Sequence, residues 1–201
     1  MKNFIQLLAV LLLLSFSIYA QEIRWQESFE TDGEGTRYTT SSFFYIGPND
    51  HCRRTDGSDI SNESTFDHSS YSNIDGTYFW AAEDVDSGGD SLDEKSILFN
   101  PINITGLTGL TFKGLFGADG NASGLGFWPF NYADYIFLDY SMNGGASFSF
   151  GLAFRHSSPP GFEPLTGPLR QDADLNGFGE GTILVPSLIE YSFDIPNGSS
   201  V

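Results

Sequence analysis

Basic residues are scarce in this sequence, with 9 lysines and arginines against 26 aspartates and glutamates and a formal net charge of −17. Because an acidic surface repels phosphate backbones, the charge argues against a domain that binds nucleic acid on its own. Disorder is also disfavoured, since charged residues make up 17% of the chain while hydrophobic residues make up 40% and aromatic residues 15%. The composition predicts a folded, acidic domain.

Cysteine is almost absent, because Cys52 is the only one and no intramolecular disulfide can form. Its neighbours His51, Arg53 and Arg54 are of the kind that activates a thiol. A nucleophilic cysteine also needs a general base and an oxyanion site, which this sequence does not mark. We therefore expect Cys52 to be a small, buried hydrophobic residue.

Long apolar runs are absent beyond the first residues of the chain. The run Leu7–Leu14 is shorter than the roughly 20 residues that span a membrane. A lysine precedes this run and the small residue Ala20 follows it, which is the pattern of a cleaved secretory signal peptide. We expect residues 1–20 to be removed, leaving one secreted or cell-surface domain, 21–201, without a membrane span.

Helical periodicity is lacking, and two-residue alternation takes its place. In Tyr135–Arg155, two alternating arms flank Asn143-Gly144-Gly145, whose residues tolerate the positive φ of a tight turn. We predict a β-hairpin here. Further strands are expected at 23–29, 37–46, 77–82, 95–100, 109–115, 182–185 and 188–195. These segments predict an all-β fold, an antiparallel two-sheet β-sandwich of the jelly-roll type.

The end of the chain reads as a strand, a turn at Pro196-Asn197-Gly198, and the start of a returning strand, 199–201. Because proteins normally cover or charge an open sheet edge, we expect the sequence to be a fragment that lacks its last strand or strands. A frayed tail is the alternative interpretation.

The segment that follows Gln171 has the composition of a calcium loop. Oxygen-bearing side chains alternate at Asp172, Asp174 and Asn176, and Gly177 permits a sharp turn. The twelfth position of the helix-loop-helix calcium template is Ile183 rather than a glutamate, so Glu180 would have to complete the site. The equal alternative is a loop of Asx turns, in which these side chains bond their own backbone.

A second acidic group lies at 83–94, where six acids precede the first base. We predict a structural Ca²⁺ site at a strand end formed by Glu30, Asp84 and Asp86. A solvated acidic loop is the alternative.

The aromatic residues Trp128, Phe130 and Tyr132 could stack on the apolar faces of sugars. The alternative is that they cap the hydrophobic core at one end of the sandwich.

No hydrolase, metalloprotease or phosphate-binding motif occurs. The segment Glu30-Thr31-Asp32-Gly33-Glu34 loosely resembles the alternating carboxylates of laminarinase-like glycoside hydrolases. In those enzymes the carboxylates stand on a strand, whereas Gly33 and Gly35 are poor strand interiors. We therefore expect no catalytic residues.

Several segments together resemble a module at the front of large secreted proteins from Bacteroidetes-type bacteria, similar in the order of its elements to MAM-like and concanavalin-like jelly-roll domains. These segments are 27–30, 35–38, 76–86, 104–112 and 172–182. The disulfides of MAM domains have no counterpart, since Cys52 is alone. The resemblance implies an accessory or adhesive unit that accompanies nucleases, hydrolases or sorting domains.

The sequence thus predicts a secreted, non-catalytic binding or adhesion module that is stabilised by calcium and recognises an extracellular glycan or protein surface. The alternative is the leading domain of an extracellular hydrolase or nuclease whose catalytic part lies outside this chain.

Overall fold

The computed structural model describes residues 22–41, 44–48, 50–60, 71–83, 85, 94–118, 130–131, 134–156, 166–198 and 200–201. Within these ranges the regular elements are strands, with no helix. The all-β fold class is therefore confirmed. The expected signal peptide, residues 1–20, lies outside the described residues. Over the described ranges, no helix is long and apolar enough to cross a membrane.

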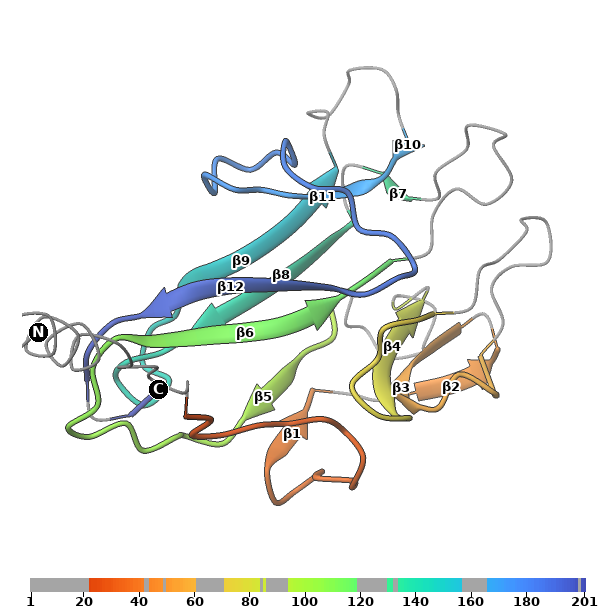
Figure 1. Ribbon diagram of the computed structural model, residues 1–201. Helices are drawn as coiled ribbons and strands as arrows, with labels where there is room; N and C mark the ends of the chain where they lie inside the picture. Colours follow the sequence, from red (N-terminus) through yellow and green to blue (C-terminus); the bar gives the residue numbers. More distant parts are fainter. Residues whose placement is uncertain are drawn as a thin grey trace, which may run out of the picture.

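In the described residues, twelve strands form antiparallel sheets (Figure 1). They are β1 (Tyr38–Thr40), β2 (Phe44–Gly47), β3 (Asp50–Thr55), β4 (Phe79–Glu83), β5 (Ile97–Phe99), β6 (Leu110–Phe116), β7 (Phe130–Asn131), β8 (Tyr135–Tyr140), β9 (Ser149–His156), β10 (Thr166–Gly167), β11 (Leu169–Gln171) and β12 (Ile189–Ile195). The sheets have the orders β11-β9-β8, β2-β3-β4, β12-β6, β1-β5 and β10-β7.

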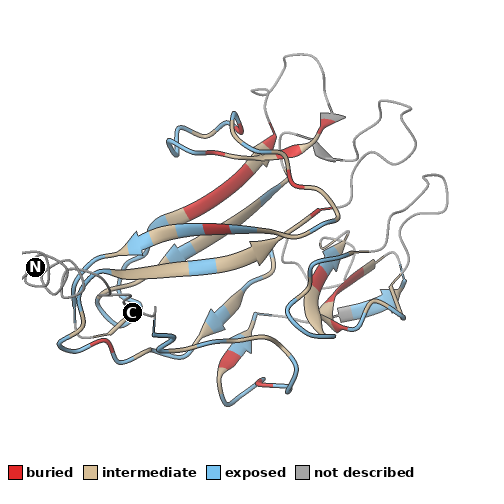
Figure 2. Ribbon diagram, viewed as in Figure 1, coloured by how far each residue is buried: buried red, intermediate tan, exposed pale blue. Residues whose placement is uncertain are grey.

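The main core lies between the β6–β12 pair and the β8–β9–β11 sheet, which run beside each other in Figure 1. Its centre is Phe154 on β9, which is fully buried and lies 4.8 Å from Tyr191 of β12 and 5.1 Å from Phe116 of β6, measured between ring centroids. In Figure 2 the longest buried stretch lies on β9. Two antiparallel layers that share one apolar core are the arrangement of a β-sandwich.

The predicted hairpin is confirmed. Tyr135 of β8 pairs with Arg155 of β9, and the ladder continues to Tyr140 and Ser149 with one irregularity after Leu138. Gly144 and Gly145 in the connecting turn have φ values of 69° and 85°, in the left-handed region that glycine tolerates. The alternation in the sequence therefore sets the register that brings Leu152 and Phe154 to the core.

A second apolar cluster joins β1 and β5 to β4. Tyr38 at the start of β1 is completely buried, and its ring meets Trp80, Phe99 and Phe29 edge-on. Trp25 packs on Phe99 from the segment that precedes these strands. Aromatic side chains thus hold the irregular first part of the chain against two sheets.

The expected strand at 23–29 is not formed, although its apolar residues do pack inward. Phe29 has a φ of 62°, which ends any extended ladder. Its N–H donates to the Glu27 carboxylate, and its carbonyl accepts from the Arg54 guanidinium. Side chains therefore replace a neighbouring strand as the partners of this backbone.

Other strand boundaries differ from the expectation. The segment 37–46 contains two short strands, and 182–185 contributes only a bridge between Ile183 and Arg170. β3, which the sequence did not predict, is rich in polar residues and pairs with both β2 and β4.

At the chain end, Val201 exchanges two backbone hydrogen bonds with Ile102, of 2.7 and 3.1 Å.

Candidate functional site

The loop 172–180 leaves the edge strand β11 and is fastened at both ends. The Asp172 N–H donates to the Ala153 carbonyl of β9, and the Gly179 N–H donates to the His156 carbonyl at the end of the same strand. After the loop, the Gly181 N–H donates a hydrogen bond of 2.8 Å to the Gln171 carbonyl. The loop is therefore a closed structure held against β9.

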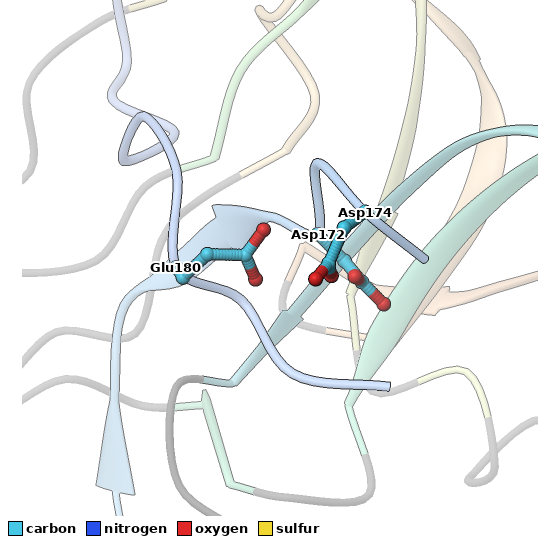
Figure 3. A group of neighbouring side chains, drawn as sticks. All are labelled: Asp172, Asp174 and Glu180. Carbon is cyan, nitrogen blue, oxygen red and sulfur yellow. The ribbon is translucent and has the colours of Figure 1, made fainter. Parts of the chain in front are cut away.

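Three acidic side chains converge inside this loop (Figure 3). Asp172, Asp174 and Glu180 each offer one carboxylate oxygen, and these oxygens all lie within 4.8 Å of one another. Two oxygens bound to the same Ca²⁺ at about 2.3–2.6 Å can be at most about 5 Å apart. The three carboxylates thus stand at separations that one calcium ion could bridge.

The same loop also contains the Asx turns of the alternative interpretation. Asp172 accepts hydrogen bonds from the Asn176 and Gly177 N–H groups, both of 2.9 Å, and Asp174 also accepts from the Asn176 N–H. Gly177 has a φ of 102° and Leu175 one of 57°, so the chain turns sharply here. These bonds hold the carboxylates in place whether or not an ion binds.

Asn176 stands in the loop but serves mainly to shape it. Its side-chain oxygen accepts the Phe178 N–H at 3.0 Å, and its side-chain N–H donates to Asp174 at 3.0 Å. Glu180 is positioned by the Ala173 N–H at 2.7 Å. The structure therefore brings together the four residues expected to bind calcium in this loop. Asp172, Asp174 and Glu180 present their carboxylates to one another, whereas the side chain of Asn176 stabilises the turn.

Sequence reasoning missed Arg155, which lies beneath the loop on β9. Its Nε lies 3.3 Å from Oδ2 of Asp172, and its guanidinium stacks on the Phe137 ring at 4.3 Å. The Asp172 side chain is 1% exposed. A pair that spans seventeen positions carries no local motif, so only the β9–β11 pairing could reveal it.

Glu30, expected at the second cation site, binds the backbone through one of its carboxylate oxygens. Its Oε1 accepts the Thr77 and Tyr78 N–H groups, both at 2.6 Å. These two hydrogen bonds, with the nearby Arg54 charge, lower the pKa of the Glu30 carboxyl from its ordinary value of 4.5. Asp84 and Asp86, its expected partners, lie outside the described residues.

Glu30→Gln is expected to destabilise the protein more at neutral pH than in acid. Because the folded-state pKa is lowered, the carboxylate stabilises the fold above about pH 4.5, and this stabilisation is lost as the pH falls through the folded-state pKa. Glutamine keeps the acceptor oxygen and removes only the charge. Urea unfolding of both proteins at pH 7 and pH 3 measures the difference, and an equal difference at both values would contradict the role of the charge.

The segment 30–34 does not form the strand that an alternating-carboxylate catalytic site requires. It is a bend followed by a turn, with Glu34 in an isolated bridge to Tyr38. The side chain of Glu30 is bound to the 77–78 backbone, while Asp32 bonds the Glu34 N–H. These carboxylates therefore do not project in parallel from one strand face.

The aromatic sugar-stacking proposal falls mostly on residues that are not described. Trp128 and Tyr132 lie outside the described residues, and of Phe130 only the backbone is described, in β7 opposite Gly167.

Cys52 is 4% exposed on β3, and burial raises the pKa of its thiol. The expectation of a small buried residue agrees with this position.

Comparison with protein-family models, with curated proteins and with solved structures finds no match for this chain.

Proposed function

We propose that this protein is a secreted, non-catalytic binding module, and that the loop 172–180 holds a calcium ion that stabilises it. The observation that carries this proposal is the convergence of the Asp172, Asp174 and Glu180 oxygens within 4.8 Å of one another. Calcium takes six to eight oxygen ligands in flexible geometry, so water and backbone oxygens would complete its shell. Extracellular calcium modules bind weakly enough to work at millimolar concentrations.

The charge distribution supports a cation here. Among the described residues, Arg155 pairs with Asp172 and no salt bridge joins Asp174 or Glu180, so these carboxylates keep an excess of negative charge. Like charges held this close repel one another, and a divalent cation would remove the repulsion. The hydrogen bonds to Asp172 use backbone N–H groups, and each carboxylate oxygen can accept more than one interaction.

A binding role accords with the acidic charge and the all-β fold. Loops that a rigid scaffold positions are common places for recognition, and the 172–180 loop is closed on β9 and β11. Calcium would rigidify this end of the sandwich, so that neighbouring surfaces are ordered before a partner arrives. The partner in this proposal is an extracellular glycan or protein surface.

Calcium is expected to raise the melting temperature of the chelated protein. At about 100 times Kd, an ion that binds only the folded state adds about 2.7 kcal/mol, or roughly 5–10 °C for a chain of this size. The increase should disappear in the double variant Asp174→Asn/Glu180→Gln. Both substitutions remove a negative charge and keep one oxygen that accepts a loop N–H, while Asp174→Asn also replaces the oxygen that accepts the Asn176 side chain.

The matched control is Glu190→Gln/Asp194→Asn on the exposed side of β12, which changes the net charge equally. This variant should retain the calcium-dependent increase. An unchanged melting temperature of the wild-type protein in saturating calcium, or the same increase in both double variants, would refute calcium binding by the loop.

A further inference from the structure

A separate polar cavity of about 200 Å³ lies beside the second apolar cluster, among elements that are apart from the loop 172–180 in Figure 1. The turn that precedes β1, the start of β1, and the strands β3 and β4 supply its walls. Its lining residues are Asp32, Glu34, Tyr38, Arg53, Arg54 and Trp80. Residues from four elements thus meet around a single space.

The aromatic wall of the cavity is rigid. Tyr38 is completely buried, and its ring packs edge-on against Trp80 with 6.1 Å between centroids. Phe29 packs against both rings from behind. An aromatic surface that is already fixed costs a ligand little ordering free energy.

The two carboxylates are also held in place, each through one oxygen. Oδ1 of Asp32 accepts the Glu34 N–H at 3.0 Å and the Tyr38 hydroxyl at 3.3 Å. Oε1 of Glu34 accepts the Thr40 N–H at 3.2 Å. Within the described part of the chain, the second oxygen of each carboxylate has no hydrogen-bond partner and remains as an acceptor for a ligand.

The two guanidinium groups are fixed in the same way. Arg54 donates from Nε and Nη2 to the carbonyls of Phe29 and Glu30 and lies over the Tyr78 ring at 3.6 Å. Arg53 pairs through Nη1 with Asp59 at 3.1 Å. With respect to the residues that the structure describes, Nη1 of Arg54 and Nη2 of Arg53 remain as donors.

The charges of the lining cancel, although the whole chain carries −17. An anion would meet Asp32 and Glu34, and a cation would meet Arg53 and Arg54, so neither is favoured over the other. Hydroxyl groups can donate to carboxylates and accept from guanidinium groups at the same time. The mixed lining therefore suits a neutral ligand that is rich in hydroxyls.

The volume limits the ligand further, because about 200 Å³ is below the roughly 300 Å³ at which pockets for drug-sized molecules begin. We propose that this cavity binds one neutral sugar residue of a glycan, with an apolar sugar face towards Trp80 and hydroxyls bonded by Asp32, Glu34 and the two arginines. The proposal rests on the binding role proposed above, but it does not depend on calcium at 172–180.

Saturation-transfer NMR with a panel of methyl glycosides of glucose, galactose and mannose tests the proposal. We expect at least one glycoside to bind the wild-type protein, and Asp32→Asn/Glu34→Gln to weaken this binding by at least about tenfold, because charged hydrogen bonds are lost. Both substitutions keep the oxygen atoms that accept the Glu34, Tyr38 and Thr40 groups. Arg53→Gln serves as the second variant if the double variant does not fold.

The control is Glu190→Gln/Asp194→Asn, which neutralises two exposed carboxylates elsewhere and should bind as the wild type does. Binding of none of the glycosides, equal binding by all variants, or binding of glycine or inorganic phosphate in their place would overturn the proposal. The spectra are recorded with calcium and with chelator. A calcium-dependent melting increase without glycoside binding would refute the sugar cavity alone, and glycoside binding without the increase would refute only the calcium loop.

Discussion

Asp172→Ala is expected to lower the free energy of unfolding by about 3–5 kcal/mol, even in chelator, because it breaks a buried charged network. The Asp172 side chain is 1% exposed and accepts two backbone N–H groups. Its ion pair is also the one polar contact of the buried Arg155 Nε, which has no hydrogen-bond partner among the described residues. Alanine would leave the Gly177 N–H and the Arg155 Nε without an acceptor, and the Asn176 N–H would keep only the exposed Asp174 carboxylate.

Asp174→Ala provides the comparison for this variant, since Asp174 lies in the same loop but is exposed. Its loss should cost less than about 1 kcal/mol in chelator. Urea unfolding of the three proteins measures both effects. If the two variants are equally stable in chelator, the buried network beneath the loop does not have the importance that we assign to it.

Phe154→Ala is expected to cost about 3–5 kcal/mol, since it leaves a large cavity between the two layers of the sandwich. Phe154 is fully buried and contacts Phe116 and Tyr191 from the opposite layer. Phe150→Ala removes the same atoms from the same strand, but Phe150 is 49% exposed. We expect this control to cost less than about 1 kcal/mol.

Urea unfolding of these two phenylalanine variants tests the position of the core. Equal losses of stability would mean that the core does not lie between β9 and the β6–β12 pair. A loss that is larger for Phe150 would place the buried face of the hairpin on the opposite side of β9.

Local patterns predicted the hairpin and the acidic loop because each is determined within a short segment. The two-residue alternation and the glycines at 144–145 are sufficient for a hairpin. The side chains of Asp172, Asp174 and Asn176 likewise bond backbone groups a few positions away. Such short-range hydrogen bonds are encoded by spacing, so sequence reasoning finds them.

The structural features that the sequence did not predict depend on contacts between residues far apart in the chain. β3 contains His51, Arg53 and Arg54, whose polarity hides a strand that is stabilised by pairing on both sides. The segment 23–29 has the apolar residues of a strand, but Arg54 binds the carbonyls at its end. Tertiary contacts therefore override local propensity in both cases.

The candidate functional residues divide in the same way. The acidic cluster of the loop 172–180 was predicted because its residues are close in sequence, whereas Arg155 joins it through strand pairing. The polar cavity joins residues from Asp32 to Trp80, and no spacing rule connects them. Glu30 was predicted as a cation ligand from its place at the end of an expected strand, and one of its oxygens binds the backbone at 77–78, a contact that no local spacing indicates.

The most direct test of a calcium-stabilised module is a crystal structure of the protein grown in calcium, compared with one grown in chelator. We predict a calcium ion in the loop 172–180, with oxygens of Asp172, Asp174 and Glu180 at about 2.3–2.6 Å. Crystals grown in calcium that show no ion there, with the Asx hydrogen bonds of Asp172 unchanged, would contradict the proposed function.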